Sequence, residues 1–182
     1  MEKYIAILRG INVSGSKMIK MDDLKLSMKE LNFQNIETYI QSGNLVFENA
    51  KMEQQKLALL ITDIIRKNFG FNVPVIVKSA DELIAVSNHN PFTIKRNESI
   101  DKLHVTFFQE EPEKELKDKL VGIKSDDDEF ILIGNVVYLF CPNGYGRTKL
   151  TNNFFEEKLK ISATTRNWKT VIKLAEMADS KY

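Results

Sequence analysis

The 182-residue chain contains a single cysteine, so no internal disulfide can form, and we expect a protein of the reducing cytoplasm. Cys141 lies in the apolar run VVYLFCP, which favours a small buried hydrophobic residue over a reactive thiol. Long apolar runs are absent as well. None approaches the roughly 20 residues of a membrane-spanning helix, and Arg9 interrupts the N-terminal run too early for a signal peptide. We therefore expect no association with a membrane.

Metal-binding and catalytic patterns are also absent. His89 and His104 are the only two histidines, and neither has a ligand-like spacing to Cys141 or to carboxylates. The acidic run SDDDE at 125–129 lacks the alternating ligands and the glycine of an EF-hand loop, so we interpret it as a charged turn. No serine lies in a nucleophile elbow, and no spacing identifies a catalytic pair of carboxylates. We expect no metal and no cofactor, and the sequence names no catalytic residue.

The charge is small but unevenly distributed. The net charge of +1 favours neither nucleic acid nor a membrane as partner. Residues 109–129 carry nine acids and four lysines, whereas residues 142–174 carry seven lysines and arginines and two glutamates. The basic segment also holds unusual polar residues, which makes an anion-binding site there worth considering.

The hydrophobic pattern predicts one order of elements twice. The run YIAILRG is apolar on both of its alternating faces, which is typical of a strand buried on both sides. Gly70 closes the clearest amphipathic helix, and Pro74 indicates an edge strand. The first half is predicted to contain strands 4–10, 36–41, 44–48 and 72–78 and helices 20–31 and 57–69. The second half is predicted to contain strands 103–108, 129–133 and 136–140, an extended segment 162–166, and helices 112–123, 149–159 and 168–178.

This repeated order predicts an α+β fold of two ferredoxin-like βαββαβ subdomains packed into one compact unit. The expected boundaries are residues 1–79 for the first subdomain and 102–182 for the second, which carries the extra C-terminal helix. Residues 80–101 are predicted to form a linker with one short helix and a polar loop. We expect the open face of each sheet to be partly covered by the other half or by the final helix.

Two polar clusters interrupt the apolar pattern in the first half. In RGINVSGSK, glycines at 10 and 15 allow close approach of a ligand to the backbone, and Arg9, Asn12 and Lys17 supply polar groups. The spacing is not that of a P-loop, so a plain strand-to-helix loop is the alternative. The second cluster, Gln41, Ser42 and Asn44 in QSGN, also has the composition of a hairpin turn.

Two further clusters lie in the basic segment. In GYGRTKL, glycines precede Arg147 and Lys149 where a helix is expected to begin, which favours an anion at the helix N-terminus; Thr148 is a candidate N-cap. In TTRNW, Asn167 is expected to cap the helix that begins at Trp168. Arg166 adds positive charge to a helix end that normally gains from Asp or Glu. If the two basic helix starts face each other, they form one cationic pocket.

Four stretches together carry a resemblance to a known family: ILRGINVSG, YIQSGNLVF, GYGRTKLTNNFFE and ATTRNWKTV. In residues and order they resemble the bacterial family called domain of unknown function 1697 (DUF1697), nearly end to end. The resemblance implies an α+β protein of two ferredoxin-like subdomains, and it brings no activity with it. Ser14 departs from the family pattern, which usually has a second glycine there.

The leading hypothesis is binding of a small phosphate-bearing ligand, such as a nucleotide, at a cationic pocket of strand ends and helix N-termini. One alternative is an RNA- or single-strand-binding module, because GNLVFE resembles a strand that stacks bases. Another is a metal-independent hydrolase or transferase that uses Asn12, Gln41 or Asn44. The candidate ligand-binding residues are Arg9, Asn12, Lys17, Gln41, Ser42, Asn44, Arg147, Lys149, Arg166 and Asn167.

Overall fold

The structure, a computed structural model, describes residues 1–123 and 125–179 of the chain. Within these residues it contains two four-stranded antiparallel sheets, with strand orders β2-β3-β1-β4 and β6-β7-β5-β8. In both sheets the first strand of the half lies at the centre, between the third and the fourth. The α+β class and the repeated order of strands predicted from the sequence are therefore observed.

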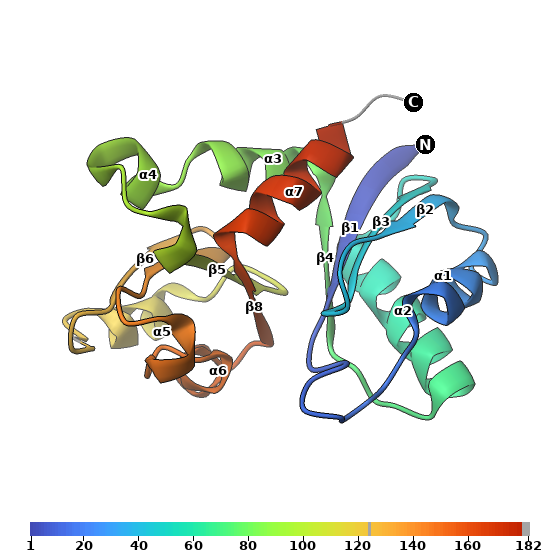
Figure 1. The fold of residues 1–182 in the computed structure, drawn as a ribbon, viewed down its shortest axis with the longest axis horizontal. Helices are drawn as coiled ribbons and strands as arrows, with labels where there is room; N and C mark the ends of the chain where they lie inside the picture. Colours follow the sequence, from blue (N-terminus) through green and yellow to red (C-terminus); the bar gives the residue numbers. More distant parts are fainter. Residues whose placement is uncertain (124, 180–182) are drawn as a thin grey trace. The chain divides into compact units, whose positions relative to one another are not determined.

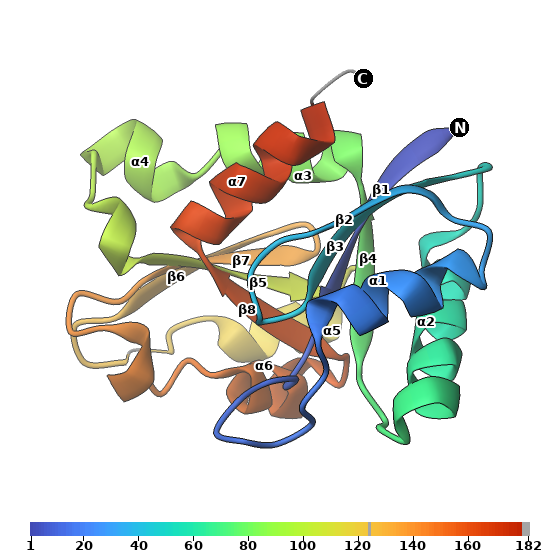
Figure 2. The same cartoon turned by 45° about the vertical axis from the view of Figure 1, so that its right-hand side comes forward.

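In the first sheet, two helices cover one face (Figures 1 and 2). The longer of these helices ends where predicted, because Gly70 takes a left-handed conformation (φ 72°) and its N–H donates to the carbonyl of Arg66. Pro74 directly precedes an edge strand, also as predicted. The elements are β1 (Glu2–Leu8), α1 (Met21–Lys29), β2 (Gln34–Thr38), β3 (Asn44–Asn49), α2 (Gln54–Phe69) and β4 (Val75–Ser79).

Strand β1 is buried on both faces, as its doubly apolar pattern predicted. Ile5 and Ile7 are fully buried on the face that points away from α1 and α2. On the other face the strand contributes to the core between the sheet and these helices. That core includes Tyr4, Ala6, Leu8, Leu24, Met28, Phe47, Leu57 and Ile61.

The second sheet repeats this arrangement with shorter helices. Its core lies between the sheet and α6, where Phe108 and Phe130 both pack edge-on against Phe155. Cys141 is buried in this core, as predicted, and burial raises the pKa of its thiol to about 11. The elements are β5 (Leu103–Phe108), α5 (Lys114–Lys117), the 3₁₀ helix η2 (Asp118–Leu120), β6 (Glu129–Ile133), β7 (Val136–Phe140), the 3₁₀ helix η3 (Tyr145–Arg147), α6 (Asn152–Leu159), β8 (Ala163–Asn167) and α7 (Trp168–Asp179).

Contacts divide the chain into two units. The first comprises residues 1–85 and the segment from Leu174 onwards, and the second comprises residues 86–173. The boundaries fall inside α3 (Ala80–Asn88) and α7, so each of these helices contributes residues to both units. Within the first unit the ammonium of Lys3 donates to the carbonyl of Met177 at 3.4 Å, which places the end of α7 beside β1.

Two predicted segments differ from the structure in helix content. The helix expected at 112–123 is only α5 followed by η2, after which Gly122 turns the chain left-handed (φ 76°). The linker expected to hold one short helix contains α3, α4 (Pro91–Arg96) and the 3₁₀ helix η1 (Ile100–Lys102). The first of these begins with a capping box, in which Ser79 and Glu82 exchange hydrogen bonds.

Candidate functional site

Two of the predicted polar clusters meet at one end of the first sheet. The loop after β1 and the turn between β2 and β3 lie against each other, and the segment before β4 joins them. The amide of Asn12 donates to the carbonyl of Gln41 at 2.9 Å, and Leu8 N–H donates to the carbonyl of Gly43 at 2.9 Å. Arg9 N–H donates to the carbonyl of Pro74 at 2.9 Å. We call residues 9–19, 40–44 and 71–74 the loop cluster.

Asn12 holds this cluster together. Its side-chain amide also donates to the carbonyl of Ile19 at 2.9 Å, and its side-chain oxygen accepts from Ile19 N–H at 2.8 Å. The asparagine therefore clamps both ends of its own loop and the neighbouring turn. Gly43 is equally constrained, because a Cβ placed on it would lie 2.7 Å from Cδ1 of Ile11 and 2.8 Å from Cβ of Leu8.

Unfavourable backbone conformations are concentrated in the loop cluster. Nine described non-glycine residues have positive φ, and four of them are here: Asn12 (54°), Ser14 (49°), Lys17 (45°) and Ile40 (50°). Isoleucine is β-branched and rarely adopts this conformation. Such residues persist only where the surrounding structure enforces them, and they gather at ligand-binding and active sites. The loop cluster is therefore the candidate site that backbone geometry favours.

Lys17 is a positioned cation in this cluster. Its ammonium donates to the carbonyl of Asn72 at 2.6 Å, which engages one of its three protons and leaves the group oriented. Ser14 and Gly15 form the tip of the same loop, where Ser16 N–H donates to the carbonyl of Val13 at 2.9 Å. Among the described residues, none accepts a hydrogen bond from the N–H of Ser14 or Gly15. The same loop therefore carries backbone donors without a partner in the described chain and an oriented ammonium, and both kinds of group can bind an anion.

The other predicted residues of the first unit have mainly structural roles. Asn44 is fully buried, and its amide donates to the carbonyl of Tyr39 at 3.0 Å and to the hydroxyl of Ser42 at 3.2 Å. Gln41 contributes its backbone carbonyl to Asn12. Arg9 is half-buried at the end of β1. The structure brings the six candidate residues of the first unit into one region, and of these only Arg9 and Lys17 carry charge. The six are Arg9, Asn12, Lys17, Gln41, Ser42 and Asn44.

In the second unit the predicted helix start at Lys149 is wrong. Helix α6 begins at Asn152 and is capped by Thr151, whose hydroxyl accepts from Phe154 N–H at 3.2 Å. Thr148 instead accepts from Leu150 N–H at 3.0 Å within the loop. Arg147 ends η3 with an exposed side chain, and Lys149 lies 3.1 Å from the carboxylate of Asp126 on the surface. These two cations are therefore not at a helix N-terminus.

Arg166 and Asn167 are placed by β8. Asn167 caps α7 as predicted, because its side-chain oxygen accepts from Thr170 N–H at 2.8 Å. Arg166 is buried on the sheet, where its guanidinium donates to the carbonyl of Thr165 at 2.9 Å and to the hydroxyl of Thr164 at 3.3 Å. Burial lowers its pKa to about 10, so it stays charged at neutral pH. It is a buried cation of the sheet rather than extra charge on an exposed helix end.

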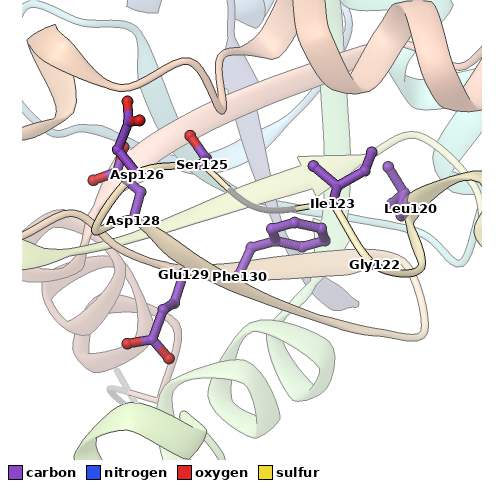
Figure 3. Close-up of a pocket in the computed structure, with 8 residues that line it drawn as sticks. All are labelled: Leu120, Gly122, Ile123, Ser125, Asp126, Asp128, Glu129 and Phe130. Atoms are coloured by element: carbon purple, nitrogen blue, oxygen red, sulfur yellow. The ribbon is translucent and has the colours of Figure 1, made fainter.

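The second unit also contains an acidic pocket of about 400 Å³ (Figure 3). In this view the carboxylate of Glu129 points to the side opposite those of Asp126 and Asp128. Glu129 accepts two hydrogen bonds from one guanidinium nitrogen of Arg96, each 2.8 Å long. Within the described chain, no three His, Cys, Asp or Glu side chains are arranged to hold a metal ion. This pocket has the wrong charge for a phosphate. It is lined by Leu120, Gly122, Ile123, Ser125, Asp126, Asp128, Glu129 and Phe130.

Sequence reasoning missed a buried lysine in β4. Lys78 is 1% exposed, and among the described residues its ammonium has no hydrogen-bond partner. Burial lowers its pKa, and the carboxylate of Glu82 opposes this only partly, because Ser79 N–H and Ser79 Oγ donate to that carboxylate at 2.9 and 3.0 Å. A lysine inside the apolar strand VPVIVK was the available signal.

Replacing Lys78 with methionine should raise the free energy of unfolding by about 1–2 kcal/mol, because methionine fills similar space without a charge to desolvate. The pKa of Lys78 in the folded protein lies below its usual 10.5. At a pH between the folded pKa and 10.5, the unfolded chain therefore binds more protons than the folded chain. Burial of the charged ammonium destabilises the wild-type protein by its full amount below the folded pKa of Lys78. This destabilisation disappears as the pH rises to 10.5. Urea denaturation across this range should show the advantage of Lys78→Met shrinking as pH rises. An advantage independent of pH contradicts this assignment.

The chain belongs to the family described as protein of unknown function (DUF1697), whose model matches residues 1–138. The match includes the loop cluster, and it ends before GYGRTKL and TTRNW. The chain is also similar to a solved structure, "The structure of conserved bacterial protein SP0830 from Streptococcus pneumoniae", with a TM-score of 0.75 and 22% identity. That similarity covers 98% of this chain and 99% of the other, and it shows the fold alone. None of the curated proteins compared with the chain matches it.

The described helices also bear on membrane association. In residues 1–123 and 125–179 no helix has both the length and the apolar character needed to cross a bilayer.

Proposed function

We propose that the protein binds a small phosphate-bearing ligand of nucleotide type at the loop cluster of its first unit. The observation that carries this proposal is the coincidence of left-handed backbone with a held cation. Lys17 is itself a left-handed residue, and its ammonium is anchored 2.6 Å from the carbonyl of Asn72. A phosphate oxygen would accept from the remaining protons of this ammonium and from the N–H groups at the loop tip.

The rigidity of the loop supports this proposal. Asn12 clamps the loop at both ends, so ligand binding would not have to order it first. Arg9 adds a second cation at the start of the same loop. Arg147, an exposed cation of the second unit, is not part of this site.

Neither alternative function gains support from the side-chain positions. An RNA-binding sheet needs accessible aromatic residues on its central strands. Phe47, the aromatic residue of GNLVFE, is 1% exposed and stacks on Phe33 in the core, with ring centroids 4.2 Å apart. A hydrolase that uses Asn12 or Asn44 would need free amides, and both amides donate to backbone carbonyls. We therefore retain ligand binding alone.

The test is a thermal-shift screen with AMP, ATP, sugar phosphates, pyrophosphate and inorganic phosphate. A ligand at about 100 times its dissociation constant adds about 2.7 kcal/mol of stability, which such a screen detects. Lys17→Met should weaken binding about tenfold, because it removes a charge-assisted hydrogen bond. Arg147→Ala, a change in the second unit, should leave the affinity unchanged. Lys56→Met, which removes an exposed lysine of α2, is the matched control. Equal affinity in Lys17→Met and Lys56→Met rules the site out.

For the fold, we infer that each unit is a ferredoxin-like subdomain. In chain order the strands of each sheet are arranged 4-1-3-2, and helices connect the first strand to the second and the third to the fourth. The predicted limits of 1–79, 80–101 and 102–182 remain a proposal. The end of α7, from Leu174, belongs to the first unit.

A further inference from the structure

A second cationic site lies in the first unit, away from every residue nominated from the sequence. It is an open pocket of about 320 Å³ between the C-terminal half of α1 and the beginning of β2. Two lysines and three amide side chains contribute to its wall, and two apolar residues complete it. These residues are Lys25, Lys29, Asn32, Phe33, Gln34, Asn35 and Ile36, and we call this site the lysine–amide pocket.

The local sequence explains why a hollow forms here. After α1 the chain reverses through Asn32, whose φ is 60°, and Asn35 is also left-handed with φ 47°. The pairing of β2 with β3 shifts register between Gln34 and Glu37, as at a β-bulge. These irregularities interrupt the regular edge of the sheet beside α1. The pocket therefore results from backbone geometry rather than from mobile side chains.

The apolar residues of the pocket are fixed by the core. Phe33 and Ile36 are 4% and 6% exposed, and both belong to the apolar cluster beneath α1 and α2. The ring of Phe33 stacks on Phe47 at an interplanar angle of 14°. Only the edges of these two side chains reach the pocket, so its floor is rigid but offers a ligand little apolar surface.

The charges of the pocket are unbalanced. Lys25 and Lys29 are four residues apart on one helix face, an arrangement in which like charges repel. Within the described chain neither lysine forms an ion pair or a side-chain hydrogen bond, whereas other lysines do. The α1 C-terminus offsets only about half a positive charge, which leaves the pocket cationic.

Neighbouring carboxylates are committed to other groups. Glu30 accepts from Lys67 at 2.8 Å and from the amide of Asn68 at 2.7 Å, and these bonds lower its pKa. Glu48 accepts from the amide of Asn35 at 2.9 Å. Glu48 keeps its charge, but neither pocket lysine forms an ion pair with a carboxylate in the described chain, and an incoming dianion would pair with both.

We propose that the lysine–amide pocket binds a phosphate monoester. The phosphate lies between the ammonium groups of Lys25 and Lys29, and the amide of Asn32 is a further donor. This site goes beyond the proposed function, because it uses none of the loop-cluster residues and stands if that cluster binds nothing.

The test uses phenyl phosphate as the probe, titrated into the ¹⁵N-labelled full chain. Saturable shifts of backbone amides between Lys25 and Ile36 are expected. Each of Lys25→Gln and Lys29→Gln should weaken binding about tenfold, because each removes one charged donor. Glutamine keeps a strong helix propensity, so the melting temperature should be unchanged or slightly higher. Lys56→Gln is the matched control and should leave the affinity unchanged.

Several results would overturn the proposal. One is the absence of saturable binding at phenyl phosphate concentrations up to ~10 mM. The others are amide shifts confined to residues outside Lys25–Ile36, or wild-type affinity in both Lys25→Gln and Lys29→Gln. Methyl phosphate, which lacks the ring, should bind about as tightly as phenyl phosphate, because the phosphate makes the charged contacts. Lys17→Met should retain wild-type affinity for phenyl phosphate. This variant separates failure of the pocket from failure of the loop cluster.

Discussion

Replacing Gly43 with alanine is expected to lower the free energy of unfolding by about 3 kcal/mol. An L-residue at its φ of 80° costs about 1–2 kcal/mol. The added methyl group would also lie 2.7 Å from Cδ1 of Ile11 and 2.8 Å from Cβ of Leu8, and such overpacking costs about 1–3 kcal/mol. Both neighbours are fully buried, so neither has space to retreat. The measurement is urea denaturation, with an accompanying fall in melting temperature of about 6–12 °C.

Gly146→Ala is the matched control for this variant. No heavy atom lies within 4 Å of the position that a Cβ on Gly146 would occupy, and the φ of Gly146 lies outside the left-handed region. Alanine there should be neutral or stabilising by up to about 1 kcal/mol, since it restricts the unfolded chain. If Gly43→Ala and Gly146→Ala have equal stability, the close approach of the turn to Ile11 is not a constraint on the fold.

Asn12→Ala is expected to cost about 2–3 kcal/mol and to abolish phosphate binding at the loop cluster. The substitution removes three hydrogen bonds, to Ile19 N–H, to the carbonyl of Ile19 and to the carbonyl of Gln41. It also places alanine at a φ of 54°, which asparagine tolerates better. Without the clamp the loop should lose the conformation that presents Lys17 and the tip N–H groups. Denaturation and the thermal-shift screen measure the two effects separately.

Asn12→Gly separates backbone strain from hydrogen bonding. Glycine accepts the left-handed conformation, so this variant should lose the same hydrogen bonds while avoiding the steric part of the cost. We expect it to be about 1 kcal/mol more stable than Asn12→Ala. Both variants should lose the ligand-induced rise in melting temperature. Retention of that rise in either variant contradicts the assignment of Asn12 as the clamp of a binding loop.

Much of the fold could be predicted from local patterns. The strands at 103–108, 129–133 and 136–140 have the predicted bounds, because alternating apolar residues and the Gly134-Asn135 turn delimit them. The length of helix α5 was overestimated. Leu116 and Leu120 have helical spacing, but this spacing also fits a single α-helical turn followed by a 3₁₀ segment. Propensity does not distinguish these outcomes where so little surface is buried.

The candidate site was predictable in composition but not in its contacts. Glycines, asparagine and cations in RGINVSGSK indicated an unusual loop, but the hydrogen bond from Asn12 to Gln41 joins residues 29 positions apart. Sequence spacing also placed Arg147 and Lys149 at a helix start, because Thr148 and Thr151 are both acceptable caps. The lysine–amide pocket had only a weak signal, since lysines four apart are ordinary on exposed helices. Its hollow depends on a register shift between strands.

The central claim is that a phosphate-bearing ligand binds at the loop cluster, and amide chemical shifts test it most directly. The ¹⁵N-labelled protein would be titrated with AMP and, separately, with pyrophosphate. The account predicts saturable changes at Gly10, Ser14, Gly15 and Lys17, which Lys17→Met weakens about tenfold. No saturable change with either compound, or changes confined to Lys25–Ile36, would contradict it.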